Sequence, residues 1–277
     1  MILHCVVACN EQQRAEAAGL RREVYCEEEG MALLPELPEL ERSDSISHLV
    51  AYLGTEPVGS LRLVMAAPSR RSNPGRFGLE LEACFELSAF EVPGVVLAEV
   101  TRFCVRRRFR GSRVAAALFD LLRLESRRRG VTHWVAAANM ETDFAEDAEL
   151  AYRLIQARGL LDGTWRAGAC GPPSAPRLRS RPAFTSEQRL KASRGDWVGL
   201  RLPRTLSLFA TKMGARYIGP PVYEPRFGVF ALPLTVDLVK LAERTLSSLP
   251  LQSNTGAGLV ANDPLPEDSK FLVLPPG

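Results

Sequence analysis

Hydrophobic and polar positions change their spacing several times along the chain, and these changes predict its elements. Apolar runs typical of β-strands lie at 1–9, 48–53, 58–65, 95–105, 131–138, 215–218 and 227–232. Segments with helical spacing lie at 11–29, 114–129, 148–158, 203–213 and 234–249. Strands and helices that alternate in this way predict an α/β fold.

Turn-forming residues separate these elements. The tetrapeptide Gly-Thr-Glu-Pro at 54–57 is expected to form a hairpin turn. Thr-Ser-Glu-Gln at 185–188 has the pattern of a capping box that opens a short helix. Gly130 and Gly214 follow helical segments, as glycine often does at a helix C-terminus. Residues 250–277 lack periodicity and contain five prolines, so we expect an irregular tail.

Composition narrows the class of protein. The chain has 277 residues, of which 46% are hydrophobic, and this suits a soluble protein of one or two domains. The net charge of +3 gives no argument for a nucleic-acid partner. No run of about 18 or more apolar residues predicts a transmembrane segment. The apolar start lacks the basic region of a signal peptide, so we interpret it as a first strand.

Cysteine usage indicates a reducing compartment. The six cysteines include no CxxC pair, and the chain has only three histidines. A structural zinc site needs four closely spaced nitrogen or sulfur ligands, so we expect no metal centre. Unpaired cysteines of this kind are typical of reduced thiols, and we expect a cytoplasmic protein.

The arginines are strongly clustered. Residues 102–129 contain ten arginines and only two acidic residues, Asp120 and Glu125. In this segment a predicted strand leads through a glycine-containing loop into a helix, so several backbone N–H groups point outward at the helix N-terminus. The pattern favours a phosphate or pyrophosphate site. A solvated basic helix is the alternative, and a Walker-type loop is excluded because no Gly-Lys-Ser/Thr occurs here.

The same segment carries a family resemblance. Val-x-x-x-x-Arg-Gly-x-x-Val-Ala-x-x-Leu at 105–118 resembles the pantetheine-pyrophosphate motif of GNAT N-acyltransferases, usually Arg-x-x-Gly-x-Gly/Ala. Arg113 replaces the middle glycine of that motif. Residues 208–219 are similar to the superfamily's later helix–Gly–strand motif. The resemblance implies that phosphopantetheine is bound by Val105, Arg110, Gly111, Ser112, Arg113, Val114 and Ala115.

A narrower resemblance covers roughly 14–140 and 203–240. The chain is similar to the branch that includes acyl-homoserine-lactone autoinducer synthases, long-chain N-acyl amino acid synthases and exosortase-associated acyltransferases. Its carrying segments are 21–30, Asp44 with Ser47-His48, Gly-Ser-Leu-Arg-Leu at 59–63 and Glu-Val-Thr-Arg-Phe-Cys-Val at 99–105.

This resemblance implies a fold. We expect a mixed central sheet with antiparallel early strands, a splayed parallel central pair and helices on both faces. Residues 1–249 would form one GNAT-like domain, with an extra helical insertion at about 140–202 that the family pattern does not require. Residues 250–277 would follow as the irregular tail.

The resemblance also implies an activity. The chain would move a medium or long fatty acyl group from an acyl carrier protein thioester to the amine of an amino acid or similar small molecule. Acyl-phosphopantetheine would be a co-substrate, with no tightly bound cofactor, and the lipid product would permit peripheral membrane contact. An acetyltransferase that uses acyl-CoA and a non-catalytic acyl-binding or partner-binding module remain alternatives.

Glu99 is the predicted general base. It lies among apolar neighbours, where desolvation raises the pKa of a carboxyl group toward a useful range. Positions 99 and 102 of a regular strand point to opposite faces, but the strand bulge of GNAT enzymes would alter this and expose an oxyanion-binding N–H. Arg102 would orient the acceptor or lock the acidic cluster, and Asp44 would help close the acceptor site. Further orienting residues would be Arg62, His48, Arg21, Arg22 and Tyr25.

Other residues have weaker assignments. Tyr217 and Tyr223 are candidates for protonating the leaving thiolate. Docking of an acidic carrier protein is predicted for Arg106, Arg107, Arg108, Arg127, Arg128 and Arg129, with a solvated basic face as the alternative. An acyl tunnel would be lined by Val95, Val96, Leu97, Phe119 and Trp134, which serve equally well as core residues.

Overall fold

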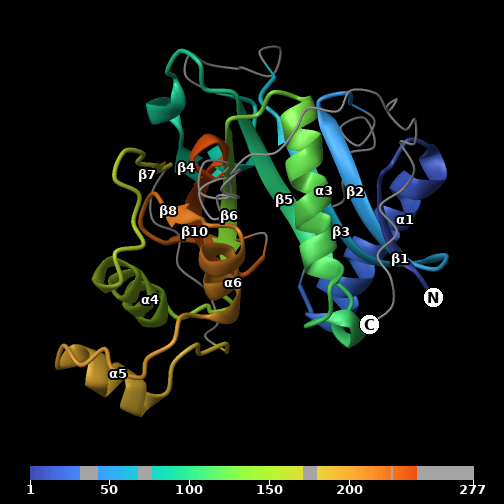
Figure 1. Ribbon diagram of the computed structural model, residues 1–277. Coiled ribbons are helices and arrows are strands. Elements are labelled where there is room, and N and C mark those ends of the chain that lie inside the picture. Colours follow the sequence, from blue (N-terminus) through green and yellow to red (C-terminus); the bar gives the residue numbers. More distant parts are fainter. Residues whose placement is uncertain (32–42, 68–76, 171–179, 226, 242–277) are drawn as a thin grey trace, which may run out of the picture.

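The computed structural model describes residues 1–31, 43–67, 77–170, 180–225 and 227–241, and Figure 1 shows how its elements are arranged. The strands are β1 (Leu3–Val7), β2 (Ile46–Leu53), β3 (Glu56–Met65), β4 (Phe85–Glu86), β5 (Leu97–Val105), β6 (His133–Asn139), β7 (Gly168–Ala169), β8 (Arg216–Tyr217), β9 (Val222–Glu224) and β10 (Val229–Asp237). The α-helices are α1 (Glu11–Arg22), α3 (Val114–Arg128), α4 (Ala145–Ala157), α5 (Ser186–Ser193) and α6 (Arg204–Lys212). Shorter helical turns are η1 (Glu23–Glu28, a π-helix) and the 3₁₀ turns η3 (Glu80–Ala83), η4 (Ser88–Phe90) and η5 (Arg107–Phe109).

The main sheet is mixed. Its strand order is β1-β2-β3-β5-β6-β10-β8, and β9 pairs with β10. The first four strands of this order are antiparallel, β5 and β6 are parallel, and β10 is antiparallel to its neighbours. The predicted mixed sheet with a parallel central pair is therefore confirmed.

The central pair is splayed. Strands β5 and β6 pair only where residues 97–99 face residues 133–135. Beyond these three positions β5 continues to Val105 and β6 to Asn139 without further pairing between their described residues. The two strands therefore diverge, as Figure 1 shows, and form a wedge between them. The wide end of this wedge is the end where β5 leads into the arginine-rich segment 106–113, here called the basic loop.

Helices cover both faces of the sheet. On β2, Val50 and Tyr52 pack in one cluster with Ala17 of α1. The alternate residues Leu49 and Ala51 belong to the main core, which also contains buried side chains of α3, α4 and α6. Because successive side chains of a strand point to opposite faces, α1 lies on one face and α3 on the other. The prediction of helices on both faces is confirmed.

Gly59 permits α3 to approach the sheet closely. A Cβ atom at this position would lie 2.7 Å from Val114 Cγ1 and 3.0 Å from Leu118 Cδ1. Any larger residue would displace the first turns of α3 from β3. The glycine therefore has a packing role that sets where the basic loop before α3 lies.

Residues 140–202 contain helices α4 and α5. Asp147 of α4 is fully buried and accepts hydrogen bonds from Arg189 and from the N–H groups of Ala183 and Phe184. The capping box of Thr185 and Gln188 is present at the start of α5. A buried carboxylate thus connects the two helices of this segment.

Three local predictions need correction. The single helix expected at 11–29 is α-helical only to Arg22 and then continues as the π-helical η1. The strand expected at 227–232 extends to Asp237, so the following helix begins later than 234. The loop expected at 162–183 contains β7, which pairs with β4 in a small second sheet. The predicted tail at 250–277 lies outside the described residues.

Candidate active site

Glu99 lies in the middle of the sheet, on β5 where the parallel pairing with β6 ends. Only 3% of its surface is exposed, and its carboxylate accepts hydrogen bonds from the N–H groups of Glu80 (2.7 Å) and Leu81 (3.3 Å). Burial and the nearby Glu80 carboxylate raise the pKa of Glu99 to about 7, against the opposing effects of Arg62 and the two N–H donors. A carboxyl group with this pKa is suited to accept a proton near neutral pH.

A bulge in β5 turns Arg102 toward the same site. Ser60 of β3 pairs with Cys104 and Arg62 with Thr101, so two steps on β3 face three steps on β5. Arg102 adopts a left-handed backbone conformation with φ of 56°. Such a conformation is costly for a residue with a side chain and persists only where the surroundings enforce it. A bulge is present in this strand, as the resemblance implied, and it lies between Thr101 and Cys104.

Glu80 joins the two arginines of the site. Its carboxylate pairs with Arg62 through one oxygen and with Arg102 through the other, the second at 3.1 Å. Arg62 is buried on β3, and Glu80 is the first residue of η3. The sequence reasoning missed Glu80, because no motif links a residue of the 77–83 loop to β5.

The polar side chains continue across the sheet toward α1. His48 of β2 is paired in register with Arg62 of β3. The His48 Nδ1 atom lies 3.4 Å from a guanidinium nitrogen of Arg21, and both residues are buried. Of the predicted orienting residues, the structure therefore brings Arg21, His48 and Arg62 into one row that leads to Arg102.

Two predicted residues lie apart from this row. Arg22 is exposed and lines a surface pocket of about 550 Å³ between α1 and the start of β3. Glu99 does not line this pocket. Asp44 is exposed just before β2, and its backbone carbonyl oxygen accepts a hydrogen bond from Arg129 at 2.9 Å. The described residues show no contact between Asp44 and Glu99.

Tyr25 contacts the bulged strand directly. From η1, its hydroxyl donates a hydrogen bond to the carbonyl oxygen of Phe103 at 2.8 Å. Its ring lies 6.2 Å from that of Phe227, and the Arg102 guanidinium lies 5.6 Å from the same Phe227 ring. Phe227, just before β10, thus brings a third element to the site. Sequence reasoning missed it, because one aromatic residue in a turn carries no signal.

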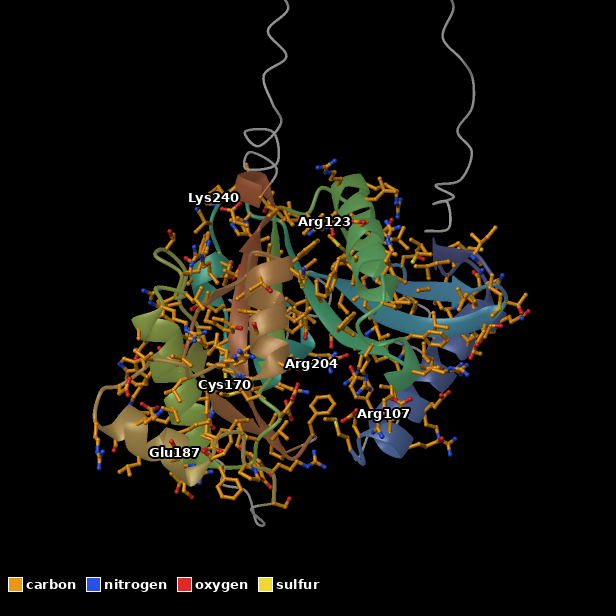
Figure 2. The ribbon with its side chains drawn as sticks, turned by 60° about the horizontal axis from the view of Figure 1, so that its bottom comes forward. Arg107, Arg123, Cys170, Glu187, Arg204 and Lys240 are labelled. Atoms are coloured by element: carbon orange, nitrogen blue, oxygen red, sulfur yellow. The ribbon has the colours of Figure 1, made fainter. Side chains whose placement is uncertain are left out.

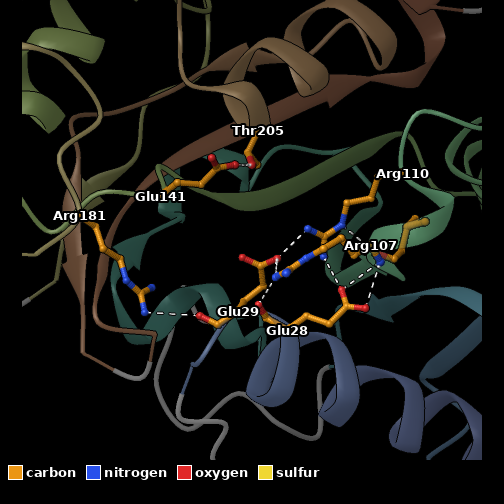
Figure 3. A network of polar contacts seen from close by, with 8 residues as sticks. Glu28, Glu29, Arg107, Arg110, Glu141, Arg181 and Thr205 are labelled. Atoms are coloured by element: carbon orange, nitrogen blue, oxygen red, sulfur yellow. Dashed lines mark hydrogen bonds and ion pairs between the residues drawn. The ribbon is translucent and has the colours of Figure 1, made fainter.

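The predicted phosphate loop is engaged by carboxylates of the protein itself (Figure 3). The Glu28 carboxylate accepts the backbone N–H of Arg107 at 3.0 and 3.1 Å and pairs with the Arg110 guanidinium at 2.9 Å. Glu29 pairs with Arg110 at 2.6 Å, and its carbonyl oxygen accepts a hydrogen bond from Arg181 at 3.5 Å. The acidic end of η1 therefore contacts both the basic loop and Arg181.

The remaining loop residues complete the start of α3. Arg113 is the N-cap of α3 and makes no side-chain capping bond, and the Ser112 hydroxyl accepts the N–H of Val114 at 3.3 Å. Gly111 has φ of 85°, a conformation that favours glycine. The predicted segment Val105–Ala115 thus forms one continuous strand–loop–helix junction at the wide end of the wedge.

The six predicted docking arginines form two separate groups. Arg106 pairs with Glu23 and Glu56, and Arg108 also pairs with Glu56. The second group, Arg127 to Arg129, lies at the other end of α3, which has 15 residues and so is about 22 Å long. Figure 2 shows Arg107 and Arg123 toward opposite ends of this helix. The structure does not bring the two groups together.

Two of the second group have an internal partner. Arg128 and Arg129 both bind the buried Glu125 carboxylate, at 2.7 and 2.6 Å, and Ser47 donates to it at 2.8 Å. The hydrogen bond from Arg128 is the main reason that the pKa of Glu125 is lowered to about 2. This cluster connects the end of α3 to the start of β2.

Other candidates are core residues. The Tyr217 hydroxyl is buried and donates to the carbonyl oxygen of Leu206 at 2.7 Å, and burial raises its pKa. Tyr223 packs edge-on against Phe230. Of the predicted tunnel residues, Leu97, Phe119 and Trp134 are buried in the hydrophobic core, Val95 is half-buried and Val96 is exposed. The structure therefore gives all of these residues except Val96 a packing role.

No helix in the described part of the chain has the length and apolar composition that a membrane crossing requires. The described residues also contain no group of three or more His, Cys, Asp or Glu side chains placed to hold a metal ion.

The family model for the N-acyl amino acid synthase FeeM matches residues 16–143. This range includes β2, β3, β5 and α3, and with them Glu99, Arg102 and the basic loop. The match confirms the predicted resemblance to N-acyl amino acid synthases and supports an N-acyltransferase activity. The chain matches none of the curated proteins with which it was compared.

Three solved structures are similar to this chain. The N-acyl amino acid synthase FeeM from uncultured soil microbes is 12% identical, with 88% of this chain and 94% of that one covered and a TM-score of 0.50. An aminoglycoside 6′-N-acetyltransferase complexed with coenzyme A is 10% identical over 86% and 97% of the chains, with a TM-score of 0.43. The CoA-dependent acyl-homoserine lactone synthase BjaI, with SAM and isopentyl-CoA, is 16% identical over 88% of each chain, with a TM-score of 0.41. The likeness to FeeM confirms the predicted GNAT-like fold.

Proposed function

We propose that this chain, which is recognised through residues 16–143 as related to the N-acyl amino acid synthases, transfers a fatty acyl group from a phosphopantetheine thioester to the amine of an amino acid or similar small molecule. The observation that carries the proposal is the buried Glu99 carboxylate at the splayed strands, with Arg62 and Arg102 close by. A base, two cations and an opening between strands are the parts that such a transfer needs.

Glu99 acts as the general base, directly or through a water molecule. It takes a proton from the acceptor ammonium, and the free amine attacks the thioester carbonyl carbon. The carbonyl oxygen becomes an oxyanion, for which we assign a backbone N–H at the β5 bulge as donor. The tetrahedral intermediate collapses with cleavage of the C–S bond, and the leaving thiolate takes up the second proton, which the attacking nitrogen loses as it becomes an amide. The products are an amide and the phosphopantetheine thiol.

Arg62 and Arg102 are assigned to the acceptor. A guanidinium binds a carboxylate through two parallel hydrogen bonds, so these arginines favour an acceptor that carries a carboxylate next to its amine. Both guanidiniums pair with Glu80. The acceptor carboxylate would therefore bind the two arginines either beside the Glu80 carboxylate or in its place. An amino acid fits this requirement better than a simple alkylamine.

The acyl donor is assigned to the wide end of the wedge. Arg110 and the loop at 105–115 would hold the phosphopantetheine phosphate, and the acidic carrier protein would dock on the exposed side chains of Arg107 and Arg108. Double charge reversal, Arg107→Glu with Arg108→Glu, is expected to raise the KM for the acyl carrier protein. Arg127→Glu, at the far end of α3, is the matched control and should leave KM unchanged. An unaltered KM in the double variant would reject this docking site.

The direct test of the activity uses purified protein with acyl carrier protein or CoA thioesters and a panel of amino acids. Mass spectrometry of the products is expected to reveal an N-acyl amino acid, and its formation should be slower in Glu99→Gln by a factor of about 10²–10⁴. Product from acyl-CoA with no product from the carrier protein would replace the proposed donor. The absence of any amide product with all donors would reject the proposed function.

A further inference from the structure

Glu80 pairs with both arginines beside Glu99. It connects polar groups of two strands. Its carboxylate binds Arg62 of β3 and Arg102 of β5, and its backbone N–H donates to the carboxylate of Glu99, also on β5, at 2.7 Å. Its side chain is 29% exposed, whereas Glu99 and Arg62 are buried. Glu80 therefore lies between the buried base and the space from which an acceptor would arrive.

The surrounding loop holds Glu80 in place. The Glu82 carboxylate is buried and accepts the N–H groups of Phe77 and Leu79 at 2.8–2.9 Å. Leu81 is buried in the second core cluster, with Phe85. Because these anchors lie on both sides of Glu80, the position of its carboxylate is set by the fold rather than by its own ion pairs.

Glu80 is both a charge beside Glu99 and an ion-pair partner of the nearby cations. The charged groups that face the Glu99 carboxylate are Glu80 of η3 and Arg62 of β3. Arg102, on the bulge of β5 itself, pairs with Glu80. A carboxylate nearby disfavours the ionised form of Glu99, and guanidiniums favour it. By neutralising both arginines and adding its own charge, Glu80 makes Glu99 a stronger base.

We propose that Glu80 is a positioning residue, which orients Arg62 and Arg102 and tunes Glu99 as a proton acceptor. This inference rests on the proposed function for its catalytic meaning. Its electrostatic content concerns only side chains of this chain, and it can be measured without turnover.

The kinetic test compares Glu80→Gln with Glu86→Gln, which removes an exposed carboxylate from the neighbouring strand β4. In Glu80→Gln the repulsion is lost and both arginines lose this carboxylate as a partner, and each change lowers the pKa of Glu99. We expect the acidic limb of kcat/KM against pH to move down by about one pH unit. The limb should stay in place in Glu86→Gln. An unmoved limb in Glu80→Gln would overturn the proposal.

A second measurement separates this inference from the proposed function. Protein labelled with ¹³C at the glutamate carboxyl carbons is titrated by NMR, and Glu99→Gln identifies the Glu99 signal. The Glu99 midpoint is expected to fall in Glu80→Gln and to stay near that of the unaltered protein in Glu80→Asp, which keeps the charge. Equal midpoints in Glu80→Gln and the unaltered protein, or equal shifts in both variants, would refute the role of the Glu80 charge. A protein without acyltransfer would still give this result.

Discussion

The acidic end of η1 competes with an incoming phosphate for the basic loop. Glu28 occupies the Arg107 N–H and one arm of Arg110, which are the groups assigned to the donor phosphate. A phosphate that binds there must displace this carboxylate. Replacing Glu28 by Gln removes its charge and keeps an oxygen that accepts the N–H bond. The variant Glu28→Gln is therefore expected to bind phosphate-bearing donors more tightly.

The size of the effect follows from exposure. The Arg110 and Glu28 side chains are 26% and 18% exposed, so their ion pair is partly screened by solvent. Pairs of this kind contribute up to about 1 kcal/mol, which corresponds to roughly a five-fold change in affinity. We expect the dissociation constant of 4′-phosphopantetheine to fall by about this factor.

The assay is calorimetric titration with 4′-phosphopantetheine and with pantetheine, which lacks the phosphate. Only the phosphorylated ligand should bind more tightly to Glu28→Gln. The matched control is Glu27→Gln, an exposed neighbour on η1 whose replacement should change neither constant. Equal changes for both ligands, or weaker binding of the phosphorylated one, would refute the competition.

Three further predictions follow from the same contacts. Because burial and Glu80 raise the pKa of Glu99 to about 7, the rate should increase as pH rises through about 7. Glu99→Gln should lower the rate by a factor of about 10²–10⁴ and abolish this pH dependence. Steady-state rates between pH 5 and pH 9 check both expectations, and a flat profile for the unaltered protein contradicts them. Gly59→Ala places a Cβ 2.7 Å from Val114 and should lower the free energy of unfolding by about 1–3 kcal/mol in urea titrations, with an unchanged midpoint as the opposing result. The pKa of Glu125 is lowered to about 2 from 4.5 mainly by Arg128, so its ionised form stabilises the fold above about pH 4.5 and this contribution is lost as pH falls toward 2. Glu125→Gln should therefore remove about 1–3 kcal/mol at pH 7 and less at pH 3, and equal losses at both values would contradict the linkage.

Local patterns in the sequence were enough to predict most elements. The apolar runs at 48–53, 58–65 and 131–138 are strands, and the segment after Arg113 is α3, because burial of one face imposes a period that a short window reveals. The basic strand–loop–helix junction was predicted for the same reason. The change from α-helix to π-helix after Arg22 was not, since an extra residue per turn leaves the composition of the segment unchanged.

The sequence also identified Glu99 and Arg102 as neighbours, through a motif and the bulge that it implied. Their environment depends on strand register and loop anchoring, which set contacts between residues far apart in the chain. Glu80 reaches Glu99 because η3 is fixed beside β5, and Phe227 reaches Arg102 from the turn before β10. Both residues lie in loop segments whose local sequence gives no sign that they contact β5.

Charge gives the clearest contrast between sequence and structure. Ten arginines within 102–129 were visible in the sequence, but a count of charges does not show which of them are neutralised. Folding brings Glu28 and Glu29 to the loop and Glu125 to the end of α3, so part of the basic charge is compensated internally. The sequence determines which charges the chain carries, and the packing of α1, η1 and α3 on the sheet determines which remain available to a ligand, because ion pairs act only over a few ångströms.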